Sequence, residues 1–227
     1  MDHYLRAAIG AVVLLTAPAA LPAAVIQVFV DLTQGSTENT GSSATITLDF
    51  SEVGVDDLLS ITIENTTPVP IGSSLTAVGL ELPDLLLTQT AFAPGGAGAY
   101  FDELMSDVSV SPGWLNAPGG YDLMLTSDRK FEGGSPQGAP TAGESETVVL
   151  RLGNIGLTPD QWSSLVLDFW AGLSEPCAIA RFQAVGPCGK DSDKVRGDVP
   201  DPATLTILLA GGVVWVTCGN RRRKIRA

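Results

Sequence analysis

The side chains available for chemistry in this sequence are almost all carboxylates. The single histidine, His3, lies near the start of the chain, and there are 25 Asp and Glu against 13 Lys and Arg. If the N-terminal segment is removed on export, no histidine remains, which excludes Ser-His-Asp and Cys-His catalysis and histidine-bound transition metals. A glycoside hydrolase needs only two carboxylates, so it stays the enzymatic alternative. Asp56-Asp57 and Asp102-Glu103 do not favour it, because neighbours in an extended strand point to opposite faces. We therefore expect a protein that is not an enzyme.

Calcium is the metal ion that suits these residues best. Asp191 and Asp193, in the sequence Asp-Ser-Asp, offer hard oxygen ligands, and weak sites suffice outside the cell. The Gly and distal Glu of an EF-hand loop are absent. A solvated acidic turn paired with Lys190 and Lys194 is the simpler interpretation. The sequence thus predicts no cofactor beyond a weak calcium site.

Two of the three cysteines lie in the central part of the chain. Cys177 and Cys188 flank a predicted strand and its turn, and an exported protein meets an oxidising compartment. A disulfide between them closes a loop of about a dozen residues and contributes about 3 kcal/mol. We predict this Cys177–Cys188 bridge, with two free thiols as the alternative. Cys218 lies in a terminal apolar segment, where it is expected to be an ordinary small apolar residue.

Aromatic residues in or beside Gly/Pro-rich loops form another candidate set: Tyr100, Phe101, Trp114 and Tyr121. Exposed rings could stack on sugars, as in a carbohydrate-binding module. Such rings also cover the ends of an apolar core, which is the interpretation we favour. Trp162 and Trp170 are expected to lie in the core.

The central part, from Val25 to Gly197, shows mainly the two-residue alternation of half-buried strands. The predicted strands are Val25–Leu32, Ala44–Phe50, Leu59–Glu64, Leu75–Leu82, Leu85–Thr90, Asp107–Ser111, Tyr121–Ser127, Glu146–Leu152, Leu165–Trp170 and Ala178–Val185. One short helix is predicted over Leu157–Trp162, with Thr158 as N-cap, Pro159 at the first position and Gln161 completing a capping box. Many short strands separated by turns predict an all-β fold, an antiparallel β-sandwich of jelly-roll or Ig-like type, in one domain over residues 25–198.

The N-terminal residues 1–24 have the layout of a secretory signal peptide. Arg6 precedes the uncharged stretch Ala7–Ala17, and small residues follow up to Ala24. This layout predicts export through the secretion translocon. A retained N-terminal anchor is the alternative.

The C-terminal residues predict a membrane segment followed by a basic stop. Pro202–Asn220 contains 19 residues without a charge, which in a helix span roughly 28 Å, close to a bilayer core. The cationic residues directly after it are Arg221, Arg222, Arg223, Lys224 and Arg226. Because Lys and Arg beside a membrane segment stay in the cytoplasm, the tail is expected inside and the body outside. A plain membrane anchor is one interpretation of this arrangement.

A Pro-x-Pro motif, an apolar segment and a terminal Arg cluster together resemble the PEP-CTERM sorting signal of Gram-negative and related bacteria. The motif corresponds to Val199, Pro200, Asp201, Pro202, Ala203 and Thr204. The resemblance covers residues 199–227 and implies that an exosortase, a membrane-embedded cysteine transpeptidase-like enzyme, removes the helix and tail. Asp201 stands where this family usually has Glu.

The net charge of the central part favours some classes of partner over others. Residues 25–197 contain 7 basic and 22 acidic residues, a net charge of −15. This disfavours nucleic acid and anionic lipid headgroups and suits solubility, cations or neutral polymers such as exopolysaccharide. The sequence thus predicts an exported structural or adhesive protein that passes through the inner membrane to the cell surface or extracellular matrix. A surface carbohydrate-binding module is the alternative function.

Overall fold

The computed structural model describes residues 25–87, 90–108, 120–127, 136–153 and 156–199. These residues form ten strands and two helices: β1 Ile26–Val30, β2 Ala44–Val53, β3 Asp56–Asn65, β4 Ser74–Leu80, α1 Asp84–Leu87, β5 Ala91–Phe92, β6 Glu103–Val108, β7 Tyr121–Thr126, β8 Ser145–Leu152, α2 Pro159–Ala171, β9 Ala178–Val185 and β10 Asp191–Asp198. The predicted signal peptide 1–24 and the predicted membrane segment 202–220 lie outside this part.

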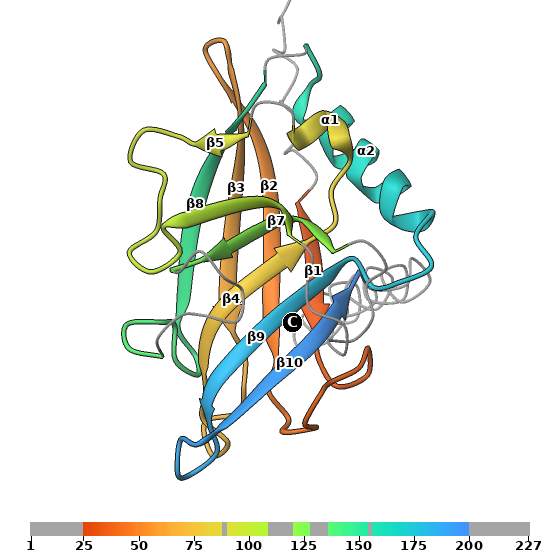
Figure 1. The fold of residues 1–227 in the computed structure, drawn as a ribbon. Helices are drawn as coiled ribbons and strands as arrows, with labels where there is room; N and C mark the ends of the chain where they lie inside the picture. Colours follow the sequence, from red (N-terminus) through yellow and green to blue (C-terminus); the bar gives the residue numbers. More distant parts are fainter. Residues whose placement is uncertain (1–24, 88–89, 109–119, 128–135, 154–155, 200–227) are drawn as a thin grey trace, which may run out of the picture.

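All ten strands belong to one antiparallel sheet in the order β5-β8-β3-β2-β1-β10-β9-β4-β7-β6. The sheet folds over so that β8, β3 and β2 lie behind β4, β9 and β10 (Figure 1). The pairs Phe29↔Asp198 and Val30↔Gly197 join β1 to β10 and so connect the two halves. The prediction of an antiparallel all-β fold is confirmed, and hydrogen bonding makes the two layers one continuous sheet.

The core lies between the two halves of the sheet, and it follows from the alternation in the sequence. On β2 the side chains of Ile46, Leu48 and Phe50 are buried. On the neighbouring strand β3, Leu59 and Ile61 lie beside them on the same face of the sheet and belong to the same core. Complete burial of such a side chain stabilises a fold by roughly 1.5–3 kcal/mol. The long β2–β3 pairing therefore forms the centre of the back layer.

Helix α2 is longer than the sequence predicted. The capping box at Thr158 is confirmed, because the Thr158 hydroxyl accepts from the Gln161 N–H while the Gln161 side chain accepts from the Thr158 N–H. The predicted strand Leu165–Trp170 is wrong, since these residues continue the helix to Ala171. Trp162 and Trp170 are buried as predicted, and the Trp162 ring stacks on Phe50 at 6.4 Å between centroids. Helical spacing brings these side chains onto one face.

Four further elements differ from the predictions, and one of them is the two-residue strand β5, Ala91–Phe92, which was not predicted. Leu85–Thr90 was expected to be a strand, but its first residues belong to the short helix α1. Strand β6 begins at Glu103, four residues before the predicted strand Asp107–Ser111, and residues 109–111 of that prediction lie outside the described part of the chain. Strand β10 was not predicted at all, because polar side chains conceal the buried positions Asp193 and Val195. Neither helix in the described ranges has the length and apolarity needed to cross a membrane.

Candidate functional site

The predicted sorting motif begins where the last strand ends. Strand β10 stops at Asp198, and the next residue, Val199, packs against the hydrophobic core. The Val199 N–H donates to the Asp198 carboxylate at 2.8 Å. The chain therefore reaches the first motif residue with no loop after the sheet. Pro200 to Thr204 and the basic residues Arg221 to Arg226 lie outside the described residues.

The candidate calcium residue Asp193 is the centre of a dense hydrogen-bond network. Its side chain is buried and accepts hydrogen bonds from the hydroxyls of Ser36, Thr37 and Thr40 at 2.6–3.1 Å. The backbone N–H groups of Thr37, Glu38 and Thr40 donate to the same carboxylate at 3.0–3.2 Å. Asp193 thereby fastens the β1–β2 loop to β10.

This network changes the electrostatics of Asp193. Burial by itself raises the pKa of the carboxyl group, but the hydrogen bonds from Thr40, Ser36 and the Glu38 backbone outweigh it and hold the pKa below the ordinary value. Hydrogen-bond donors thus already occupy the oxygens of this ionised carboxylate, which is unlike a calcium site, where the oxygen lone pairs point at the ion.

Asp191, the other candidate ligand, is exposed at the start of β10, and the strand register shifts between Asp191 and Asp193. Over the described ranges, no three His, Cys, Asp or Glu side chains converge in a group that could hold a metal ion. A weak calcium site at this pair stays a prediction.

The predicted Cys177–Cys188 disulfide is wrong. Both cysteines are free; Cys177 is buried and Cys188 is exposed. They lie at opposite ends of β9, whose eight residues separate them by roughly 26 Å at 3.3 Å per residue. A disulfide requires Cα atoms within about 7 Å. The Cys177 thiol instead contacts the Asp198 carboxylate and the Gly197 carbonyl, each at 3.7 Å.

Three of the four aromatic residues considered for sugar stacking lie in the described part of the chain, and all three are buried in the interior. Tyr100, Phe101 and Tyr121 are buried, and the rings of Tyr100 and Phe101 meet edge to face at 5.3 Å between centroids. This agrees with the core interpretation rather than with an exposed platform. Trp114 lies outside the described residues.

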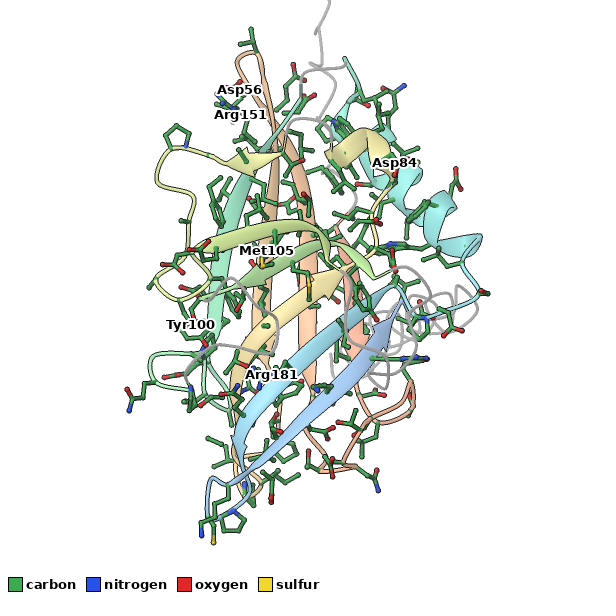
Figure 2. All side chains as sticks on the ribbon, viewed as in Figure 1. Asp56, Asp84, Tyr100, Met105, Arg151 and Arg181 are labelled. Atoms are coloured by element: carbon green, nitrogen blue, oxygen red, sulfur yellow. The ribbon has the colours of Figure 1, made fainter. Side chains whose placement is uncertain are left out.

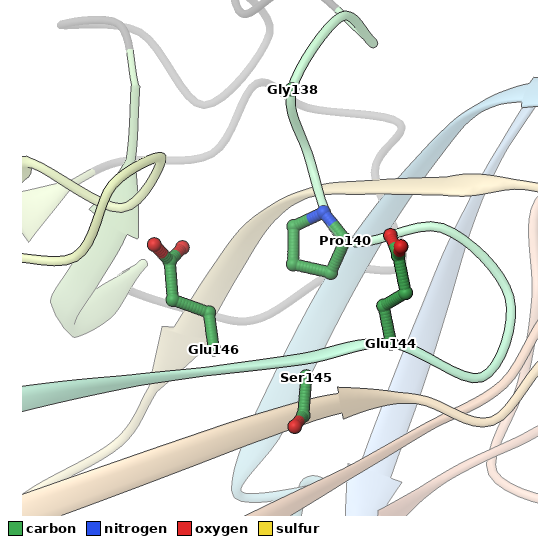
Figure 3. Close-up of a pocket in the computed structure, with 5 residues that line it drawn as sticks. All are labelled: Gly138, Pro140, Glu144, Ser145 and Glu146. Atoms are coloured by element: carbon green, nitrogen blue, oxygen red, sulfur yellow. The ribbon is translucent and has the colours of Figure 1, made fainter.

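A surface hollow of about 330 Å³ is lined by Gly138, Pro140, Glu144, Ser145 and Glu146 (Figure 3). Glu146 accepts hydrogen bonds from the backbone N–H groups of Tyr100 and Phe101, at 2.8 and 3.1 Å. Glu144 accepts from the N–H and hydroxyl of Thr141, which lower its pKa. Both carboxylates therefore hold neighbouring backbone in place.

The acidic pairs singled out in the sequence do not come together. Asp56 marks one end of β3, whereas Tyr100, two residues before Asp102, lies toward the opposite end of the sheet (Figure 2). The pair that does converge is Glu81, just after β4, with Asp122 on β7, and these two side chains are hydrogen-bonded. Sequence reasoning missed this pair because the strands that bring it together are 40 residues apart in the chain.

Burial and the neighbouring Asp122 raise the pKa of Glu81 to about 8. Glu81 is therefore protonated at neutral pH and donates its hydroxyl hydrogen to Asp122. The direct hydrogen bond places the two carboxyl groups closer than the roughly 5 Å or more that a glycoside hydrolase needs between its acids.

No protein-family model matches this chain, and no curated protein or solved structure matches it either.

Proposed function

We propose that this chain is an exported structural or adhesive protein of the cell surface or exopolysaccharide matrix, and that it is not an enzyme. In this proposal residues 1–24 direct secretion through the translocon. Residues 25–198 form the delivered domain, whose folded-over sheet serves as a sandwich of jelly-roll or Ig-like type. Residues 199–227 hold the chain in the inner membrane until an exosortase-like enzyme processes it.

The observation that carries this proposal is the order of features in the last 29 residues: Pro200-Asp201-Pro202, an uncharged stretch of 19 residues from Pro202, and the basic cluster from Arg221. This order favours a membrane segment with its positive end in the cytoplasm. The position of the motif supports the proposal because its first residue, Val199, directly follows β10, the last described strand.

The polar groups of the domain support a structural role. Asp193, Glu144 and Glu146 are each engaged by backbone N–H groups of neighbouring loops. Carboxylates used in this way stabilise the loops that donate to them. The net charge of −15 over residues 25–197 favours a soluble surface that interacts with neutral polymers.

The test is the fate of a chain whose motif is altered. The double variant P200A/P202A is expressed in the bacterium that encodes the protein and is located with an antibody against the folded domain. We expect the wild type at the cell surface and in the medium, and the variant retained in the inner membrane as the longer precursor.

A matched control comes from a second Pro-x-Pro sequence, Pro68-Val69-Pro70, which is exposed in the β3–β4 connection. The variant P68A/P70A also replaces two prolines of a Pro-x-Pro sequence, but outside the motif, and should be processed as the wild type. Normal release of P200A/P202A would overturn the sorting proposal.

A further inference from the structure

The carboxyl pair Glu81–Asp122 lies where four parts of the fold meet. The Glu81 carbonyl accepts the indole N–H of Trp170, from the last turn of α2, at 2.6 Å. The Glu81 N–H donates to the Cys177 carbonyl at 2.8 Å, next to the start of β9. The Leu82 N–H donates to the Asp122 carboxylate at 2.8 Å. The backbone at Glu81 and Leu82 thus connects α2, β7 and the segment leading into β9.

From this geometry we infer that Glu81 and Asp122 form a pH-sensitive latch, closed while they share a proton and opened when Glu81 ionises in alkaline medium. The inference goes beyond the proposed function and does not depend on sorting.

Tyr121 links the pair to further titratable groups. Glu81, Glu175, Cys177 and Arg196 all act electrostatically on Tyr121, and Asp198 contacts Cys177. Arg196 is the cation of this set, and its guanidinium pairs with Glu175 at 3.0 Å. Burial raises the pKa values of Tyr121 and of the Cys177 thiol far enough that both stay neutral as Glu81 titrates. Within the described residues, Asp122 is therefore the charged group that acts on Glu81, and the nearby cation Arg196 is engaged by Glu175.

The direction of the pH effect follows from Glu81. Its pKa in the folded protein, about 8, lies above the ordinary value of 4.5, so the folded state holds this proton more tightly. The stabilisation is fully present below about pH 4.5 and is lost as the pH rises through about 8. Two carboxylates then repel each other, and the contacts from Glu81 and Leu82 to Trp170, Cys177 and Asp122 weaken.

Cys177 is a built-in reporter of this opening, because its thiol is buried beside the latch whereas the Cys188 thiol is exposed. The full-length protein is treated with iodoacetamide at pH 6.5 and pH 9.5, and peptide mass spectrometry gives the labelling rate of each cysteine. Because the buried Cys177 thiol has a raised pKa, ionisation alone also raises the ratio of the Cys177 rate to the Cys188 rate as the pH increases. We therefore compare variants, and expect this ratio to rise several-fold more between pH 6.5 and pH 9.5 in the wild type than in the variant E81Q.

The variant E81Q keeps a neutral hydrogen-bonding side chain at all pH values, so its ratio should rise only as far as thiol ionisation raises it. E64Q, which changes an exposed glutamate on β3, is the matched control and should respond as the wild type. D122N removes the facing charge and should behave as E81Q, and it replaces E81Q as the reference if E81Q does not fold. The inference is overturned if the wild-type ratio rises no more between pH 6.5 and pH 9.5 than the ratio of the latch variants. It is also overturned if circular dichroism shows that the wild type unfolds globally at pH 9.5.

Discussion

The Thr40 hydroxyl donates a 2.6 Å hydrogen bond to the carboxylate of Asp193, which lies 153 residues further along the chain. This contact belongs to the network that fastens the β1–β2 loop to the last strand of the sheet. Because β1 also pairs with β10, the network and the strand pairing together close the fold at the junction of its two halves.

Replacing Asp193 should therefore destabilise the whole domain. In D193A the partly buried hydroxyl and N–H donors of the loop lose their acceptor, at a cost of roughly 1–3 kcal/mol in the free energy of unfolding. Urea unfolding followed by tryptophan fluorescence measures this change. The control D191A removes an exposed carboxylate two residues away and should change the free energy by less than about 0.5 kcal/mol. Equal effects of the two substitutions would contradict the assigned role of Asp193.

The same network predicts a loss of stability in acid. The pKa of Asp193 in the folded protein lies below its ordinary value of 3.8, so the ionised form contributes stability above about pH 3.8 and loses it as the pH falls through the folded pKa. Unfolding free energies measured between pH 5 and pH 2 should fall less steeply in D193N than in the wild type. Parallel curves for the two proteins would show that another group controls acid unfolding.

The cysteines should behave as two different free thiols. At neutral pH we expect Cys188 to react with iodoacetamide in the native protein, and Cys177 to react only after denaturation, because it is buried with a raised pKa. Peptide mass spectrometry distinguishes the two sites. A peptide linking Cys177 to Cys188 in the non-reduced digest would contradict the separation of these residues along β9.

Helix α2 should depend on its buried tryptophan. W162A removes a ring that is 1% exposed and stacked on Phe50, and such Trp to Ala changes cost about 3–5 kcal/mol. L167A removes an apolar side chain that is 40% exposed on the same helix and should cost far less. Thermal or urea unfolding of both variants measures the difference. Similar losses would indicate that α2 does not dock through Trp162.

Strands with alternating apolar residues were predictable from the sequence, whereas elements that mix polarity were not. Ile46, Leu48 and Phe50 alternate so regularly that only a half-buried strand fits them. Strand β10 lacks a recognisable apolar alternation, because one of its buried residues, Asp193, is a carboxylate. Its burial is possible only because distant residues of the chain donate hydrogen bonds to it. In α2 the apolar run from Leu165 also fits a strand, and only its continuity with the capped turn at Thr158 indicates a helix.

The interactions between distant residues could not be predicted from local patterns. Cys177 and Cys188 are close in sequence, but the intervening strand holds them apart. Glu81 and Asp122 are far apart in sequence, and the pairing of β4 with β7 brings them together. The sorting motif is the opposite case, because its residues are contiguous and its interpretation rests on their linear order.

The most direct test of the proposed function is the C-terminus of the protein recovered from the cell surface and the culture medium of its native host. Intact mass and C-terminal peptide sequencing identify the last residue. The account predicts a C-terminus at or near Val199 to Thr204, with the membrane segment and basic tail removed. A chain that still ends at Ala227 would mean that residues 199–227 are a permanent anchor, and it would contradict processing at the motif.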